Sequence, residues 1–184
     1  RVEQFSYFHI NMSLFDRLRQ IKIFIFDVDG VLTDGALYVF NNGEQVRRMS
    51  IKDGYALQLA VKKGYHIIII SGSYSEAVTL RLNKLGIEAV FMKVTDKKSK
   101  VEELLPQYEA DWTNVLFMGD DIPDYAVMKA AGFACAPSDA APEIKQAAHY
   151  ISPFAGGCGC VREMIEKVMK LHGQWELDIH IPSK

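Results

Sequence analysis

The sequence predicts a doubly wound α/β fold, in which helices cover both faces of a mainly parallel β-sheet. Three observations support this prediction. Short apolar stretches alternate with stretches of helical length from residue 53 onward. The first apolar stretch, at 21–26, is unbroken, as expected for a strand that is buried on both faces of a sheet. Glycines follow several predicted helices, where they can adopt the left-handed conformation that ends a helix.

The first part of the domain is predicted to contain a short helix, the first strand and a small flap. Ser13 can cap a helix that continues to about Arg19, and the apolar strand follows at 21–26. Two strand-like stretches, at 37–40 and 45–49, flank the turn-rich sequence Asn-Asn-Gly-Glu. They predict a projecting β-hairpin, which is too small to be a separate domain.

The remainder of the domain is predicted to alternate between helices and strands. We expect helices at 53–63, 75–85, 97–105, 123–131, 140–147 and 159–171, and strands at 66–70, 88–91, 114–118 and 133–136. Gly64, Gly86 and Gly132 directly follow predicted helices and are expected to end them. No repeat or linker divides the chain, so we expect one domain at 13–175 and a C-terminal tail at 176–184.

Composition and charge limit the classes of function. Residues 1–12 are expected to be an N-terminal extension or an added leader, because Met12 is a suitable natural start. The net charge of −2 gives no basic surface for nucleic acid, and no apolar run is long enough to span a membrane. The 3 cysteines, an odd number, favour a reducing compartment. We therefore expect a cytoplasmic protein that binds neither nucleic acid nor membrane.

Polar residues follow three of the predicted strands. These residues, with the lysine that begins the helix at 97–105, are Asp27, Asp29, Ser71, Gly72, Lys97, Asp120, Asp121 and Asp124. Ligands bind outside the carboxyl ends of strands in such sheets, so we expect these residues to converge. Each residue alone could be a cap, a turn residue or a solvated side chain. Several converging carboxylates would repel one another unless a cation lay among them, and oxygen ligands point to Mg²⁺.

The same residues resemble the motifs of the haloacid dehalogenase superfamily. The motifs occur in order as Asp27-Val-Asp29-Gly-Val-Leu-Thr33, Ser71, Lys97 and Gly119-Asp120-Asp121-Ile-Pro-Asp124. The resemblance extends from residue 21 to about residue 171, and each of the four motifs lies at its expected place along the chain. It implies a Rossmann-like fold of this superfamily and a magnesium-dependent phosphatase that acts through an aspartyl-phosphate.

The resemblance also implies roles for the acidic residues. Asp27 is expected to be the nucleophile, and Asp29 the acid/base that protonates the leaving alcohol and then takes a proton from water. Mg²⁺ is expected to bind Asp27, the backbone carbonyl of Asp29, and Asp120. Asp121 and Asp124 are expected to orient these ligands rather than to bind the ion.

The other catalytic residues are expected to hold the phosphoryl group. The Ser71 hydroxyl and the Gly72 amide would bind the phosphoryl oxygens. Lys97 would pair with the same group and with Asp27. These residue types are the ones that a phosphate dianion requires, because its charge must be offset before a carboxylate can approach it.

The spacing of the motifs narrows the family to members without a cap domain, because Asp27, Ser71 and Lys97 lie too close in sequence for a cap to be inserted. The uncapped branch that the chain resembles is the 3-deoxy-D-manno-octulosonate 8-phosphate phosphatases, tetrameric enzymes of bacterial lipopolysaccharide synthesis. The stretches that carry this resemblance are 27–35, 42–44, 51–55, 119–124 and 156–163. It implies a phosphorylated sugar acid as substrate and a homotetramer. In that tetramer we expect the hairpin to pack between subunits, and the glycine run at 156–159 to reach into a neighbour's site.

Two positions depart from the pattern of this branch, which often has Arg where this chain has Ser73 and Cys158. Both are possible contacts for the carboxylate of the substrate, so the sugar is less well defined than the chemistry. The other cations that could make this contact are Lys52, Arg48, Arg81 and Lys84, of which Lys52 and Arg81 are the predicted substrate-binding residues. Thr33 is a further predicted substrate-binding residue. Arg81 is equally well explained as a solvated helix residue.

Three alternatives remain open at this point. The first is a phosphatase of a related nine-carbon keto-sugar acid phosphate. The second is a phospho-receiver signalling domain, which also uses Mg²⁺, an acidic cluster, a hydroxyl and a lysine, but which has its phosphoacceptor on a middle strand. The third is an inactive scaffold subunit, which is disfavoured because every motif residue is present.

Overall fold

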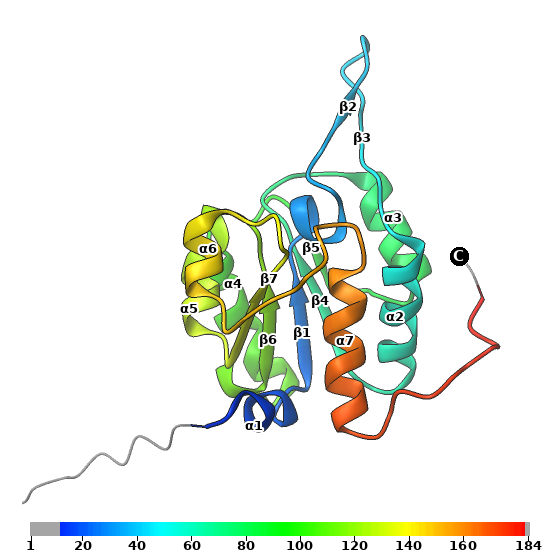
Figure 1. Cartoon of the computed structure of the whole chain (residues 1–184). Helices are drawn as coiled ribbons and strands as arrows, with labels where there is room; N and C mark the ends of the chain where they lie inside the picture. The colour runs from blue at the N-terminus through cyan, green and yellow to red at the C-terminus, as the bar shows by residue number, and fades with distance from the viewer. Residues whose placement is uncertain (1–11, 183–184) are drawn as a thin grey trace, which may run out of the picture.

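A six-stranded parallel sheet forms the centre of the structure, a computed structural model that describes residues 12–182 (Figure 1). The strands are β1 (Ile23–Phe26), β4 (His66–Ile70), β5 (Val90–Phe91), β6 (Val115–Met118), β7 (Phe133–Ala136) and β8 (Tyr150–Ile151). Their order is β5-β4-β1-β6-β7-β8, and each neighbouring pair is parallel. The chain extends the sheet first on one side of β1 and then on the other, so the carboxyl end of β1 lies at the crevice where such sheets bind ligands.

Strand β1 is apolar throughout because both of its faces are covered. Successive side chains of a strand point to opposite faces of the sheet. Phe24 and Phe26 therefore enter one hydrophobic core, and Ile23 and Ile25 enter the other. All four side chains are fully buried. The predicted buried first strand is confirmed.

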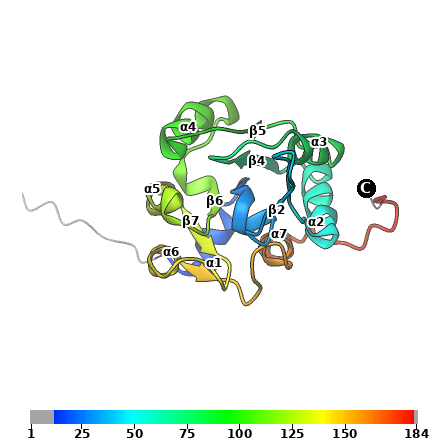
Figure 2. The ribbon, with the colours of Figure 1, turned by 90° about the horizontal axis from the view of Figure 1, so that it is seen from above.

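Helices cover both faces of the sheet, as predicted (Figure 2). The helices are α1 (Leu14–Arg19), α2 (Ile51–Lys62), α3 (Glu76–Lys84), α4 (Lys97–Leu104), α5 (Tyr125–Ala130), α6 (Pro142–Ala147) and α7 (Cys160–Leu171). Helices α2, α3 and α7 contribute to the core that contains Phe24, whereas α4, α5 and α6 contribute to the other core. Ser13 caps α1, because its hydroxyl accepts a hydrogen bond from the amide of Asp16.

The number of strands and the role of one glycine differ from the prediction. Strand β8 was not predicted, because a pair of residues is too short to produce a hydrophobic pattern. Gly64 and Gly86 have the expected positive φ angles of 87° and 88°, but Gly132 does not have a positive φ. Gly132 is instead required by close packing, since a Cβ atom there would lie 2.6 Å from the carbonyl oxygen of Thr113.

The predicted hairpin is present and projects beyond the carboxyl ends of the strands (Figure 1). Its strands, β2 (Tyr38–Val39) and β3 (Gln45–Val46), are antiparallel, and Gly43 forms part of the turn with a φ of 84°. The hairpin exposes large apolar side chains at Leu37, Tyr38, Val39, Phe40 and Val46. An exposed apolar group of this size is typical of a surface that contacts another molecule.

The described part of the predicted tail lies along α2. Within the tail, the carbonyl oxygen of Asp178 accepts a hydrogen bond from the Tyr55 hydroxyl, and the Asp178 carboxylate pairs with Lys62. Directly before the tail, the Trp175 ring meets the Tyr55 ring edge to face, with 6.3 Å between their centroids. Residues 1–11, which hold most of the predicted N-terminal extension, and residues 183–184 lie outside the described part. Between residues 12 and 182, the helices are too short or too polar to cross a bilayer.

Candidate active site

The carboxyl ends of β1, β4 and β6 meet at a cavity of about 300 Å³. The residues that were predicted for catalysis, phosphate binding and metal binding all line it: Asp27, Asp29, Ser71, Gly72, Lys97, Asp120, Asp121 and Asp124. Four segments that are far apart in sequence supply these residues: the loops after β1, β4 and β6, and the start of α4. The three loops meet because parallel strands place their carboxyl ends at one edge of the sheet. The predicted convergence is therefore present in the structure.

The loop after β1 brings the first motif close to the acidic loop after β6. Gly30 has a φ of 82°, and a Cβ atom at this position would lie 1.9 Å from Asp120 Oδ2, so only glycine allows this approach. The Thr33 hydroxyl oxygen accepts hydrogen bonds from the amides of Gly30, at 3.2 Å, and Gly35, at 3.3 Å. Thr33 was predicted to bind substrate, but it is fully buried and does not line the cavity. Its hydroxyl shapes this loop instead.

A buried lysine joins the ends of β1 and β6. Lys97 Nζ lies 3.0 Å from Asp27 Oδ1 and 2.6 Å from Asp124 Oδ1. Asp124 also makes a second contact, in which its Oδ2 atom accepts a hydrogen bond from the Asp120 amide at 3.0 Å. Lys97 therefore makes the predicted contact with Asp27, and Asp124 fixes both Lys97 and the loop that carries Asp120.

Burial and neighbouring charge shift the protonation of these groups. Burial, together with the charge of Asp124, raises the pKa of Asp27 to about 7 although Lys97 opposes this shift. Burial, together with the charges of Asp27 and Asp124, raises the pKa of Asp120 to about 8. For Lys97, burial would lower the pKa, but the two aspartates outweigh burial and raise it. One lysine does not neutralise this set of carboxylates.

The carboxylates of Asp27, Asp120 and Asp124 fit a divalent cation. Each can offer an oxygen, and these oxygens lie within 4.8 Å of one another. A set of oxygen donors without sulfur or imidazole suits Mg²⁺. Asp124 already binds Lys97 and the Asp120 amide, so Asp27 and Asp120 are the more available ligands, in agreement with the predicted division of roles.

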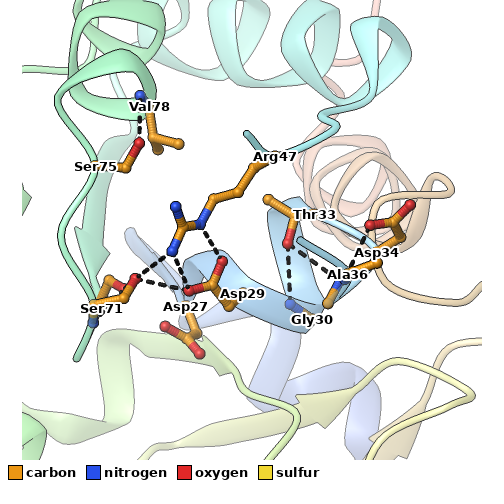
Figure 3. A network of polar contacts seen from close by, with 12 residues as sticks. Asp27, Asp29, Gly30, Thr33, Asp34, Ala36, Arg47, Ser71, Ser75 and Val78 are labelled. Atoms are coloured by element: carbon orange, nitrogen blue, oxygen red, sulfur yellow. Dashed lines mark hydrogen bonds and ion pairs between the residues drawn. The ribbon is translucent and has the colours of Figure 1, made fainter. Parts of the chain in front are cut away.

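The structure adds one residue to the predicted site, Arg47, which extends from the base of the hairpin (Figure 3). Its Nε atom donates to Asp29 Oδ1 at 2.6 Å, and its Nη2 atom donates to Asp29 Oδ2 at 3.2 Å. Burial alone would raise the pKa of Asp29, but the hydrogen bonds from Arg47 and Ser73 outweigh it and lower that pKa. The adjacent Arg48 was predicted as a candidate cation instead, but the Arg48 side chain is exposed and donates to Asp34. Both arginines lie on the predicted hairpin, and the sequence does not indicate which of them faces the site.

The loop after β4 places the hydroxyls of Ser71 and Ser73 at the cavity. Ser71 is buried, and its Oγ atom accepts a hydrogen bond from the Ser73 amide at 3.1 Å. The Ser73 hydroxyl donates to Asp29 Oδ2 at 2.7 Å. A Cβ atom on Gly72 would have 3.7 Å to its nearest neighbour, the carbonyl oxygen of Val94, so the cavity is open beside this residue. Ser73 thus contacts the predicted acid/base.

The other predicted substrate contacts do not line the cavity. Lys52 lies on α2 and lines a separate groove of about 690 Å³ with Cys158 and Arg162. The Arg81 guanidinium lies against α2, since a Cβ atom on Gly54 would be 3.0 Å from it. Neither cation lines the cavity within one chain, and the contact with substrate that was predicted for them stays a prediction.

The glycine run packs against the chain's own loop after β1. A Cβ atom on Gly156 would lie 2.0 Å from the Gly30 carbonyl oxygen. The Gly157 amide donates to the Val31 carbonyl oxygen at 2.9 Å. These contacts explain the glycines within a single chain, and the contact with a neighbour's site stays a prediction.

A pair of aspartates after the central strand of a doubly wound sheet, next to an acidic cluster that suits Mg²⁺, is the arrangement of haloacid dehalogenase-like hydrolases. A family model with this description matches residues 74–163. The 3-deoxy-D-manno-octulosonate 8-phosphate phosphatase of Yersinia pestis is 33% identical over 171 residues, which cover 91% of each chain. The chain belongs to the family of these phosphatases, and it is a phosphoric monoester hydrolase.

Solved structures of relatives agree with this assignment. The crystal structure of the Yersinia pestis phosphatase has a TM-score of 0.85 and 32% identity, and the match covers 87% of this chain and 86% of that one. A phosphatase of the same name from Moraxella catarrhalis was solved with a magnesium ion, a phosphate ion and 3-deoxy-D-manno-octulosonate. It has a TM-score of 0.83 and 29% identity, with coverage of 85% of this chain and 90% of that one. The acidic cluster and this relative agree on Mg²⁺ as the cofactor.

Proposed function

We propose that the protein hydrolyses 3-deoxy-D-manno-octulosonate 8-phosphate to the free sugar acid and phosphate, with Mg²⁺, as a step of lipopolysaccharide biosynthesis. The observation that carries the proposal is that two carboxylates in one cavity are each held by a different basic residue. Asp27 is held by Lys97 beside the acidic cluster, and Asp29 is held by Arg47 on the other side. The names of the relatives support this choice of substrate.

In the proposed mechanism, Asp27 is the nucleophile. One of its oxygens attacks phosphorus, the bond to the leaving alcohol breaks, and an aspartyl-phosphate forms on Asp27. Asp27, Asp120 and the backbone carbonyl of Asp29 would hold Mg²⁺, which would neutralise charge and bind a phosphoryl oxygen. Lys97 keeps Asp27 in place during the attack, because it also bonds to Asp124.

Asp29 acts as the acid and then as the base. It takes up a proton from solvent before the first step and gives this proton to the leaving alcohol. In the second step it takes a proton from the water that attacks the aspartyl-phosphate. The Ser71 hydroxyl and the Gly72 amide hold the phosphoryl oxygens in both steps, since both residues line the same cavity. Phosphate leaves, and Asp27 and Asp29 return to their starting states.

An assay of a panel of phosphate esters with Mg²⁺ tests the proposal. The panel contains the eight-carbon acid phosphate, a nine-carbon keto-sugar acid phosphate and hexose phosphates. The eight-carbon acid should have the highest kcat/KM, and a higher value for the nine-carbon acid would favour the first alternative substrate class. Membership of a phosphatase family favours a hydrolase over a phospho-receiver domain.

We further propose that the protein is a homotetramer in which a neighbouring subunit covers the uncapped cavity. The exposed apolar side chains of the hairpin support an interface at this element. Such an interface also offers a way for Lys52 or Arg81 to approach a neighbour's substrate. Light scattering after gel filtration measures the mass. A stable monomer with full activity would contradict the proposal.

We propose the cytoplasm as the place of action. Cys158 is an exposed free thiol, and Cys135 and Cys160 are buried free thiols. Thiols of this kind persist in a reducing compartment. Cell fractionation with an antibody tests this assignment, and recovery from an oxidising compartment would contradict it.

A further inference from the structure

The side chain of Arg47 is buried at the base of an otherwise exposed hairpin. It is 4% exposed, whereas the side chain of the adjacent Arg48 is 66% exposed. Arginine is rarely buried unless its guanidinium is paired. The backbone of Arg47 lies between the β2–β3 pairing and an isolated bridge that joins Thr33 to Met49. The polar contacts of the guanidinium therefore determine where this side chain lies.

Hydrogen bonds from Arg47 and Ser73 hold the carboxylate of Asp29, the proposed acid/base (Figure 3). The Arg47 guanidinium donates to both oxygens of Asp29, and it also donates to Ser73 Oγ at 3.4 Å. The Ser73 hydroxyl donates to Asp29 as well. Together these donors use most of the acceptor sites of one carboxylate. Asp29 is thus already engaged before a substrate arrives.

The rest of the cavity is acidic and offers little to a second anionic group. Lys97 lines the cavity, but it is held between Asp27 and Asp124. A sugar-acid phosphate brings a carboxylate in addition to its phosphate. The Arg47 guanidinium lies beside Asp29, and a guanidinium binds planar carboxylates through two parallel hydrogen bonds. Two carboxylates, one on Asp29 and one on the substrate, can therefore compete for Arg47.

We propose that Arg47 exchanges partners when a sugar-acid phosphate binds. Its guanidinium leaves Asp29 for the carboxylate of the substrate, and Asp29 becomes free to face the leaving-group oxygen. The inference rests on the proposed function, because it requires Asp29 to be the acid/base. The exchange needs no change of fold, only a side-chain movement that the substrate favours through its stronger interaction with one arrangement. An ester without a carboxylate leaves Asp29 engaged and is a poorer substrate.

The kinetic test compares two esters with similar primary alcohols, of which only one carries a carboxylate: 6-phosphogluconate and glucose 6-phosphate. Arg47→Met should lower the ratio of their kcat/KM values, acid over neutral ester, by about 10- to 100-fold, the range for loss of hydrogen bonds between charged groups. Arg47→Lys keeps the charge and should retain part of the ratio. Arg48→Met is the matched control, since Arg48 bonds to Asp34 and should leave the ratio at its wild-type value.

Binding provides a second readout that does not depend on turnover. The Nε–H resonance of Arg47, identified by its absence in Arg47→Met, should shift when free 3-deoxy-D-manno-octulosonate is added, and mannose should not shift it. A resonance that stays in place while the sugar acid binds would overturn the exchange. An equal loss of kcat/KM on both esters in Arg47→Met would also overturn it, because a merely structural residue affects both alike.

Failure of the proposed function would look different. In that case the wild-type protein would show no preference for the eight-carbon acid phosphate over the rest of the panel. The ratio between 6-phosphogluconate and glucose 6-phosphate, and the Arg47 resonance, would still decide whether the guanidinium selects carboxylates.

Discussion

Lys97 is shared by two aspartates that follow different strands. It lies within 3.0 Å of both Asp27 and Asp124, and all three side chains are buried. One positive charge cannot neutralise two buried carboxylates, which is why the pKa of Asp27 is raised to about 7 by burial and by Asp124. We therefore expect the proposed nucleophile to depend on the metal ion, because a bound cation would keep Asp27 ionised at neutral pH.

Asp27→Asn should abolish hydrolysis and preserve the fold. The amide has nearly the same volume, but it cannot form an acyl phosphate and is a weaker ligand for Mg²⁺. Steady-state assays at saturating Mg²⁺ measure the loss, and thermal unfolding monitors the fold. Asp16→Asn, at an exposed position on α1, is the control and should stay close to wild-type activity. Appreciable turnover by Asp27→Asn would exclude Asp27 as the nucleophile.

Asp29→Asn should lower kcat by about 10²- to 10⁴-fold, the usual range for the loss of general acid catalysis. The amide can still accept a hydrogen bond from Arg47, so the cavity should keep its shape. Measurement of kcat with the best substrate of the panel tests this expectation. A kcat within a few-fold of wild type would show that another group provides the proton.

At the residue scale, the sequence predicts those site residues whose positions the sheet topology determines. The aspartates and Ser71 directly follow strands, so their convergence follows from the parallel sheet alone. Arg47 could not be predicted, because its place depends on the path of the hairpin and on which of two adjacent arginines turns inward. Thr33 was assigned to the substrate on its motif position, but the turn that closes the loop buries it.

At the scale of elements, a side chain of α2 caps the first turn of helix α7. Asp53 Oδ1 accepts a hydrogen bond from the Arg162 amide in the first turn of α7 at 2.8 Å, and Asp53 is 2% exposed. Its Oδ2 atom has no hydrogen-bond partner among the residues that the structure describes. Burial raises the pKa of Asp53, although hydrogen bonds from the Arg162 and Gly159 amides oppose this shift. This capping contact ties α7, and with it the glycine run, to α2.

Asp53→Ala should therefore lower the free energy of unfolding by about 1 kcal/mol, the usual effect of losing a helix-capping side chain. Asp53→Asn should lose less, because its amide oxygen can still accept from the Arg162 amide and no charge is buried. Urea unfolding at neutral pH measures both values. Equal losses in the two variants would contradict a capping role.

Gly157→Ala should impair catalysis without touching the substrate. Gly157 has a φ of 62°, and a Cβ atom there would lie 2.7 Å from the Asp34 amide nitrogen, so alanine must displace the loop after β1. Gly173→Ala is a matched control, since Gly173 has a φ of 67° with nothing within 4 Å. Both variants carry the same backbone strain, about 1 kcal/mol. A kcat/KM that falls equally in both would argue against support of the loop.

Elements with strong local signals were predicted most closely. Strands β4 and β7 match the predicted ranges of 66–70 and 133–136, because continuous apolar runs between helices define them. Helix α6 begins at Pro142 rather than near 140, since proline is favoured in the first turn of a helix. The helix expected at 123–131 divides into a short turn at 122–124 and α5. There the Asp121 carboxylate accepts a hydrogen bond from the Ile122 amide, and the turn it caps delays the start of the helix.

At the scale of the whole molecule, Mg²⁺ should stabilise the protein more at pH 8 than at pH 5. Burial and neighbouring carboxylates raise the pKa of Asp27 to about 7 and that of Asp120 to about 8, well above the values of an unfolded chain. The metal-free folded state thus binds more protons than the unfolded state. The stability from these groups is complete below about pH 4 and is lost as the pH rises through 7 to 8.

Thermal unfolding with Mg²⁺ or with chelator across this pH range measures the effect. At a hundredfold excess over Kd, binding adds about 2.7 kcal/mol, or roughly 5 to 10 °C for a protein of this size. Asp120→Asn should reduce the shift and flatten its dependence on pH. A shift in Tm that is the same at pH 5 and pH 8 would contradict the proposed ligand set.

The contact between the glycine run and the loop after β1 joins the first part of the domain to the last part that is synthesised. The Cys160 thiol donates to the Val31 carbonyl oxygen across 129 residues of chain, and the Gly157 amide donates to the same oxygen. A ribosome that adds about 5–20 residues per second needs roughly 6 to 25 seconds to cover that distance. The nucleophile emerges among the first residues of the domain, but its loop lacks support until the last helix emerges. We therefore expect an unfinished chain that lacks the last helix to hydrolyse phosphate esters poorly.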